Sequence, residues 1–265
     1  MEWNEGWRVY AGSDGLAHAE VLPGPTCPYC GGVGRREALI DGVLRVGKCR
    51  CQRVVDRVAL WNAACVPARH AGCSMESFRL DVQGARPGWQ GTRGWLDRYR
   101  PGLENKGLVL TGDPGRGKTH LMCAAVRELI FRHGVPVRFV EFTHLLSRIR
   151  EGIDQKNGDA TTLTPLVQVP VLAIDELGKG RKTDWELAII DELVTRRYNT
   201  SGTLLATTNF KVKRAARRGE AVPSLANTVE ETLGERLGDR VFSRLVETTE
   251  FAGVIGEDYR VTQGR

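Results

Sequence analysis

The sequence predicts an α/β protein in which a parallel five-stranded sheet, flanked by helices, follows a small cysteine-bearing module. Three observations predict this arrangement. An apolar strand leads through a glycine-rich turn into an apolar helix, and a second apolar strand ends in two acids at 175–176. Two cysteine pairs precede both strands. We therefore divide the chain into an N-terminal module with a linker helix, residues 1–70, and an α/β domain, residues 71–265.

Length and charge suit a medium-sized domain with a small one attached. Charged residues make up 26% of the 265 residues and the net charge is +6, which permits a nucleic-acid partner without requiring one. No apolar run approaches the roughly 20 residues that a membrane span needs, and the first residues lack the basic-then-apolar order of a signal peptide. We expect a cytoplasmic protein without a membrane segment, whose seven cysteines are thiols or metal ligands rather than disulfides.

The cysteine pairs have the layout C-x₂-C-x₁₈-C-x-C, formed by Cys27, Cys30, Cys49 and Cys51. Between the pairs, two apolar runs flank the dipeptide Asp41-Gly42, which is a strong signal for a two-residue hairpin turn. A hairpin with a cysteine pair at each open end is typical of a zinc ribbon. Four thiolates would close the coordination shell, so we expect a structural rather than a catalytic Zn²⁺. The alternative is a set of unmetallated thiols.

A predicted helix at 52–64 follows the cysteines, and the whole region is rich in basic side chains. Two interpretations stay open: contact with nucleic acid or an acidic partner, or a solvated surface. The basic residues are Arg35, Arg36, Arg45, Lys48, Arg50, Arg53, Arg57 and Arg69.

Residues 112–119 match G-x-x-x-x-G-K-[ST], the phosphate-binding P-loop. Its glycines let successive N–H groups point into one concavity, and the helix that follows adds its positive N-terminal end. Lys118 supplies a charge for the β- and γ-phosphates, and the Thr119 hydroxyl is placed for Mg²⁺. The residues expected to contact the nucleotide are Gly112, Asp113, Pro114, Gly115, Arg116, Gly117, Lys118, Thr119 and His120.

Three further side chains are candidates for the hydrolysis chemistry. The apolar strand at 169–174 ends in Asp175 and Glu176, where parallel sheets bind ligands. Asp175 would hold Mg²⁺, and Glu176 would orient or deprotonate the attacking water. Asn209, at the end of the strand 203–209, would lie beside the γ-phosphate as a sensor of hydrolysis. The alternative for Asn209 is a residue in an ordinary strand-ending turn.

Alternating strands and helices fill the rest of the α/β domain. Apolar and β-branched runs predict strands, and helical periodicity predicts helices. The polar stretch 152–164 is predicted to be a mobile loop, and residues 77–80 could cover a nucleotide base. The strands are predicted at 109–111, 135–142, 169–174, 203–209 and 251–255, and the helices at 95–99, 117–130, 143–149, 184–199 and 233–245.

The last predicted helix carries Arg240 and Arg244, which are four residues apart and share one helix face. Either could reach the γ-phosphate of a neighbouring subunit as an arginine finger, and surface salt bridges are the alternative. The basic run 211–218 could approach DNA or be solvated.

The order of these motifs resembles AAA+ ATPases and, more closely, the DnaC/DnaI family of replicative helicase loaders. The resemblance implies that Arg240 rather than Arg244 is the finger and that Arg260 is a second, sensor-like arginine. It also implies an ATPase core without a full lid. The segments that carry the resemblance are the cysteine pairs and 112–121, 174–178, 196–199, 207–209, 234–240 and 258–260.

The resemblance further implies an ATP-dependent helicase-loading protein that acts in the initiation of DNA replication. Its cofactors would be ATP or ADP, Mg²⁺ and Zn²⁺. Its partners would be the hexameric replicative helicase, single-stranded DNA and further copies of itself, which assemble through the ATP site. Assembly and DNA would stimulate hydrolysis, and the protein would be associated with the nucleoid.

Two other functions compete with this one. An IstB-like ATPase would regulate a transposase–DNA complex, but the N-terminal part of that relative resembles a helical module rather than a cysteine ribbon. A non-enzymatic zinc adaptor would have a degenerate ATPase core, and the intact Lys118, Asp175 and Glu176 argue against it.

Overall fold

The computed structural model describes residues 6–24, 26–154, 163–212 and 231–259. Its centre is a five-stranded sheet of order β6-β7-β8-β5-β9, in which every neighbouring pair is parallel. This confirms the predicted α/β architecture. The strands are β5 (Gly107–Thr111), β6 (Val137–Glu141), β7 (Val171–Asp175), β8 (Thr203–Thr208) and β9 (Thr249–Gly253).

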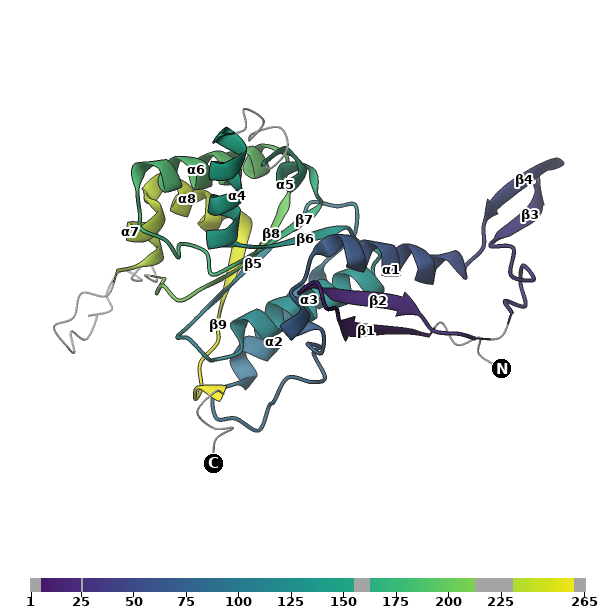
Figure 1. Ribbon diagram of the computed structural model, residues 1–265, viewed down its shortest axis with the longest axis horizontal. Coiled ribbons are helices and arrows are strands. Elements are labelled where there is room, and N and C mark those ends of the chain that lie inside the picture. Colours follow the sequence, from purple (N-terminus) through teal and green to yellow (C-terminus); the bar gives the residue numbers. More distant parts are fainter. Residues whose placement is uncertain (1–5, 25, 155–162, 213–230, 260–265) are drawn as a thin grey trace.

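Helices cover both faces of the sheet, and therefore the central strands β7 and β8 are buried along their whole length. One face packs against α1 (Gln52–Ala64), α2 (Arg86–Arg98) and α3 (Lys118–Phe131). The other face packs against α4 (Phe142–Asp154), α5 (Thr164–Gln168), α6 (Asp184–Asn199), α7 (Leu233–Leu237) and α8 (Asp239–Thr248). The two helical layers lie on opposite sides of the sheet in Figure 1. No helix in the described part of the chain is long and apolar enough to cross a membrane.

The N-terminal residues form a hairpin, β1 (Trp7–Ala11) and β2 (Ala17–Val21), which packs on α1 and a short 3₁₀ helix, Ala68–His70. The Trp7 ring stacks on Phe131 of α3 with 3.6 Å between ring centroids, and Trp61 of α1 contacts the same ring. One hydrophobic core therefore includes residues on both sides of position 70. The domain boundary at 70 stays a prediction.

The cysteine-bearing hairpin is the part of the N-terminal region that stands apart from this core (Figure 1). It consists of β3 (Arg35–Ile40) and β4 (Val43–Lys48), paired antiparallel, and every residue of both strands is exposed. Asp41 and Gly42 connect them with φ values of 54° and 77°, the left-handed backbone that the predicted two-residue turn requires.

The predicted helix at 233–245 is two helices, because Gly238 has a φ of 84° and a ψ of 151° and interrupts the helical path between α7 and α8. The short helix expected at 95–99 is the end of the longer α2. Most of the predicted loop 152–164, most of the basic run 211–218, and Arg260 lie outside the described residues.

Candidate functional site

The glycine-rich loop connects β5 to α3. Its backbone conformation and its close contacts require glycine at three positions. Gly112, Gly115 and Gly117 have φ values of 145°, 77° and 86°, where side chains are strained. A Cβ on Gly112 would lie 2.2 Å from the Val254 carbonyl oxygen, and one on Gly115 would lie 2.0 Å from the Asp258 carboxylate. The loop therefore forms the tight cradle that the P-loop pattern predicts.

Lys118 begins α3 and is buried, with 7% of its surface exposed. Its ammonium donates a hydrogen bond of 2.7 Å to the carbonyl oxygen of Asp113, on the opposite side of the loop. Arg116 forms an ion pair of 3.2 Å with the Asp113 carboxylate. The lysine charge is thus held inside the cradle, which suits the binding of phosphate.

Asp175, at the end of β7, is tied to the helix after the P-loop and to β8. Its carboxylate accepts hydrogen bonds from the Thr119 hydroxyl at 2.9 and 3.2 Å and from the Thr207 hydroxyl at 2.6 Å. Burial raises the pKa of Asp175, and the hydroxyl donors Thr207 and Thr119 oppose that shift. Because Mg²⁺ prefers oxygen ligands, Thr119 and Asp175 together fit the predicted magnesium site.

The raised pKa of Asp175 leads to a stability prediction. At neutral pH the folded protein holds a buried carboxylate, so we expect Asp175→Asn to raise the midpoint of thermal unfolding when nucleotide and Mg²⁺ are absent. The gain should shrink as the pH falls through the folded-state pKa, because Asp175 then becomes neutral in the original protein too. Thermal melts over acidic to neutral pH measure this difference.

The exposed Asp81 provides the control for that measurement. Its pKa is lowered by the hydrogen bond from Arg79, which is the opposite direction, so Asp81→Asn must not raise the unfolding midpoint at neutral pH. A pH-independent difference between the original protein and Asp175→Asn would contradict the raised pKa.

Glu176 follows in a left-handed conformation, with a φ of 58°. Its N–H donates to the Thr207 hydroxyl at 2.9 Å, and its carboxylate forms an ion pair with Lys179. Asn209 is exposed just beyond the end of β8, next to Thr208, whose hydroxyl donates to the Leu177 carbonyl oxygen at 2.9 Å. The two threonines therefore link the end of β8 to the residues that follow β7, next to Glu176 and Asn209. The sequence placed both threonines in the 207–209 segment directly before the predicted sensor, but it suggested no role for their hydroxyl groups.

A segment before β5 packs against the start of α3. The His120 ring nitrogen Nε2 lies 3.0 Å from the Ser74 carbonyl oxygen and 3.2 Å from the Ser77 hydroxyl, and burial lowers the pKa of His120. The Phe78 ring contacts His120 and lies 6.1 Å from the Tyr259 ring. The segment expected to cover a base therefore lies against the P-loop, and the His120 side chain binds that segment.

The two candidate finger arginines share one carboxylate on α6. Arg244 forms an ion pair of 3.0 Å with Asp191 and has 20% of its side chain exposed. Arg240 contacts Asp191 at 3.5 Å and has 69% of its side chain exposed. Of these two arginines, Arg240 is the more exposed to a neighbouring molecule.

The four predicted metal ligands, Cys27, Cys30, Cys49 and Cys51, have sulfur atoms that all lie within 4.8 Å of one another. The Sγ atoms of Cys27 and Cys49 are 3.8 Å apart, and those of Cys30 and Cys51 are 3.6 Å apart. A tetrahedral Zn²⁺ with sulfur ligands at about 2.3 Å requires sulfur separations of about 3.8 Å. The cluster therefore fits Zn²⁺.

Backbone support also favours a metal at this cluster. The Gly34 N–H lies 3.2 Å from the Cys30 sulfur. Burial raises the pKa of the Cys30 thiol, but this hydrogen bond and the other three cysteines outweigh it and lower the pKa to about 7. Burial and the same shared hydrogen bonds raise the pKa of Cys51 to about 12. A thiolate is the form that binds Zn²⁺, and the shared hydrogen bonds favour the first thiolate of the cluster at Cys30.

Comparison with known proteins identifies the family to which the chain belongs. Residues 103–264 match the family described as IstB-like ATP binding protein. The replicative helicase loader DnaC of Escherichia coli K12 is 24% identical over 193 residues, or 72% of each chain. The phage-like element PBSX protein XkdC of Bacillus subtilis is 29% identical over 187 residues, or 66% of this chain and 67% of XkdC.

Solved structures show the same fold. The crystal structure of the DnaC helicase loader has a TM-score of 0.59 and 27% identity, and the match covers 71% of this chain and 99% of that chain. The structure of DnaI has a TM-score of 0.53 and 20% identity over 73% of this chain and 93% of that chain, a likeness that concerns the fold alone.

Proposed function

Because the chain belongs to the family of IstB-like ATP-binding proteins, we propose that it is an ATP-dependent loader of a replicative DNA helicase. It has an AAA+ P-loop core and is related to proteins of DNA replication. The observation that carries the proposal is the likeness to the DnaC helicase loader, which extends over nearly the whole solved DnaC chain. Membership of the family by itself allows a transposition helper as well, so the partner decides between the two.

In the proposed reaction each subunit contributes half of an ATPase site. The P-loop N–H groups and Lys118 bind the phosphates, while Thr119 and Asp175 hold Mg²⁺, which neutralises phosphate charge when bound. Glu176 orients the attacking water and accepts its proton, and Asn209 senses the γ-phosphate. Arg240 of the adjacent subunit stabilises the charge that develops on the transferred phosphoryl group, so hydrolysis requires self-assembly. Single-stranded DNA stimulates turnover by favouring that assembly.

The exposed hairpin β3–β4 is the proposed contact with the helicase. Four aliphatic side chains surround its turn, with exposed fractions between 47% and 74%: Leu39, Ile40, Val43 and Leu44. Exposed apolar side chains gathered at one place favour a protein partner, since nucleic acid is bound mainly by cations and aromatic rings. Arg35, Arg36, Arg45 and Lys48 stand on the same two strands and would match acidic residues around an apolar groove.

This contact is tested by a pull-down against the host's hexameric replicative helicase, with and without ATP. Leu39 and Leu44 are cross-strand partners, so Leu39→Ser/Leu44→Ser alters one face of the hairpin without touching the cysteines. We expect this variant to lose at least about 90% of helicase capture, because a few apolar anchors dominate such interfaces, and to keep its ATPase activity.

Leu103→Ser/Val246→Ser removes two exposed aliphatic side chains elsewhere and is the matched control, which should capture helicase normally. Equal capture by the hairpin variant and the control would rule out the hairpin contact. The second candidate function, which the family match favours, is an IstB-like regulator of a transposase–DNA complex. A parallel pull-down with a transposase that captures the protein, while the helicase does not, would support it.

A further inference from the structure

The loop that joins β7 to α6, residues 177–182, begins directly after Glu176 and is held by contacts from three directions. The Leu177 N–H donates to the Thr207 carbonyl oxygen at 2.7 Å, and the Thr208 hydroxyl donates to the Leu177 carbonyl oxygen. At the far end, Thr183 and Glu186 form a capping box that starts α6. The middle of the loop is held by one side chain from α7.

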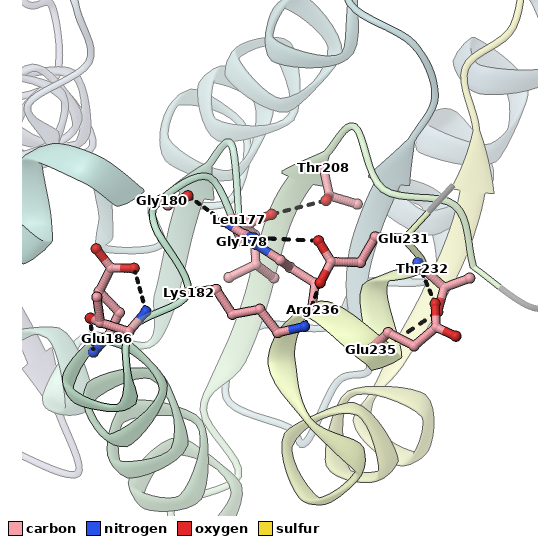
Figure 2. Close-up of polar contacts among 11 residues, drawn as sticks. Leu177, Gly178, Gly180, Lys182, Glu186, Thr208, Glu231, Thr232, Glu235 and Arg236 are labelled. Atoms are coloured by element: carbon pink, nitrogen blue, oxygen red, sulfur yellow. Dashed lines mark hydrogen bonds and ion pairs between the residues drawn. The ribbon is translucent and has the colours of Figure 1, made fainter. Parts of the chain in front are cut away.

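That side chain is Arg236, at the centre of Figure 2. Its Nε donates a 2.7 Å hydrogen bond to the Gly178 carbonyl oxygen, and an amino group of the same guanidinium donates to the Gly180 carbonyl oxygen. The guanidinium also lies over the Phe210 ring, 5.2 Å from its centroid. Only 13% of the Arg236 side chain is exposed. The hydrogen bond to Gly178 is partly buried, and the one to Gly180 lies at the surface.

A second contact joins the same two segments. Lys182 of the loop lies 2.5 Å from a Glu231 carboxylate oxygen, and the other oxygen of Glu231 lies 3.3 Å from Arg236 (Figure 2). Glu231 thus balances the charge of both cations. The planar guanidinium of Arg236 thus contacts two carbonyl oxygens, one carboxylate and one aromatic ring. A lysine cannot make all of these contacts, because its ammonium group is a single point charge.

The contacts of Arg236 connect to both halves of the proposed ATPase. On one side lies the loop whose first residue follows Glu176. On the other side α7 leads within four residues to Arg240, through a corner in which Gly234 packs on Phe242 and Leu233, Leu237 and Val241 are buried. The loop itself continues into α6, whose Asp191 binds Arg240. Glu176 and Arg240 are therefore connected through one set of contacts, in which Arg236 joins α7 to the loop after Glu176.

We propose that Arg236 is a positioning residue that couples the two halves: it sets the place of Glu176 in its own subunit's site and the presentation of Arg240 to the neighbouring subunit's site. The proposal rests on the trans-finger arrangement of the proposed function. A change in the loop when ATP is hydrolysed is transmitted through Arg236 to the finger that the next site uses.

The first test is Arg236→Lys, which keeps the positive charge beside Glu231 and loses the fork to Gly178 and Gly180. We expect turnover to fall at least about tenfold, because small misplacements of catalytic groups have effects of this size, while ATP affinity stays within about twofold. Arg93→Lys, at an exposed ion pair with Asp97, is the matched control and should retain full turnover. Thermal melts report whether each variant is folded.

The second test separates the two halves by mixing subunits. An Arg240→Ala subunit supplies an intact pocket without a finger, and a Glu176→Gln subunit supplies a finger without a competent pocket. The mixture should hydrolyse ATP although each variant alone does not. Arg236→Lys is then placed in one subunit or the other, and we expect loss of activity in both placements.

Loss in one placement alone, or in neither, overturns the coupling. An inactive mixture that contains Arg236 in both subunits contradicts the trans finger instead, which is a failure of the proposed function. In that case turnover and affinity of the uniform Arg236→Lys protein still decide whether Arg236 positions Glu176. A fall in affinity in proportion to turnover would show a general structural defect and refute the positioning role.

Discussion

Lys118→Ala is expected to weaken ATP binding by at least about 100-fold, because a buried ammonium aimed at phosphate is worth about 3 kcal/mol. Lys118 is 7% exposed and is held inside the P-loop by the Asp113 carbonyl oxygen. The P-loop N–H groups remain in the variant, so residual binding reflects their contribution alone. Equilibrium titration with a fluorescent ATP analogue measures the change, and turnover should be undetectable at ordinary ATP concentrations.

Lys106→Ala is the matched control, since Lys106 is an exposed lysine that precedes β5 and lies outside the loop. It should bind ATP as the original protein does. An ATP affinity for Lys118→Ala within about threefold of the original protein would contradict the assignment of the P-loop as the nucleotide site. Thermal melts without nucleotide show whether the variant is folded.

The second large effect concerns the finger. Arg240→Ala should lower DNA-stimulated turnover by about 1,000-fold, the lower end of what arginine fingers contribute, and leave ATP affinity almost unchanged. Arg240 has 69% of its side chain exposed and only a long contact to Asp191, so its removal costs the folded subunit little. Turnover is measured at saturating ATP over a range of protein concentration, because the proposed site forms between subunits.

Arg244 provides the comparison within the same helix. Its ion pair with Asp191 is shorter and more buried, so Arg244→Ala should lower the midpoint of thermal unfolding and reduce turnover less than Arg240→Ala does. Normal hydrolysis by Arg240→Ala would remove Arg240 from the proposed mechanism. Loss of turnover in Arg244→Ala, with an unchanged unfolding midpoint, would make Arg244 the finger.

The amino-acid sequence was enough to predict the α/β architecture, which the structure confirms, and it predicts where the catalytic and binding residues lie. The P-loop pattern and the apolar strand before Asp175 are local: their residue types require a particular backbone conformation wherever the chain leads next. The hairpin at Asp41-Gly42 is local in the same sense, because its turn demands left-handed backbone. The cysteine spacing predicted a cluster whose sulfur separations fit Zn²⁺.

Which side chains contact one another could be read only from the packed structure, because such contacts join residues that are distant in the chain. In the sequence, Arg197 is only one residue of the 196–199 segment. In the structure it is buried, and its guanidinium donates to the carbonyl oxygens of Leu166, Val169 and Thr203. Arg236 is likewise only one residue of the 234–240 segment in the sequence. In the structure it donates hydrogen bonds to carbonyl oxygens of a loop 56 to 58 residues earlier in the chain. Exposure separates Arg240 from Arg244, although both lie on one helix face. These outcomes depend on packing between elements, which residue types along one segment do not specify.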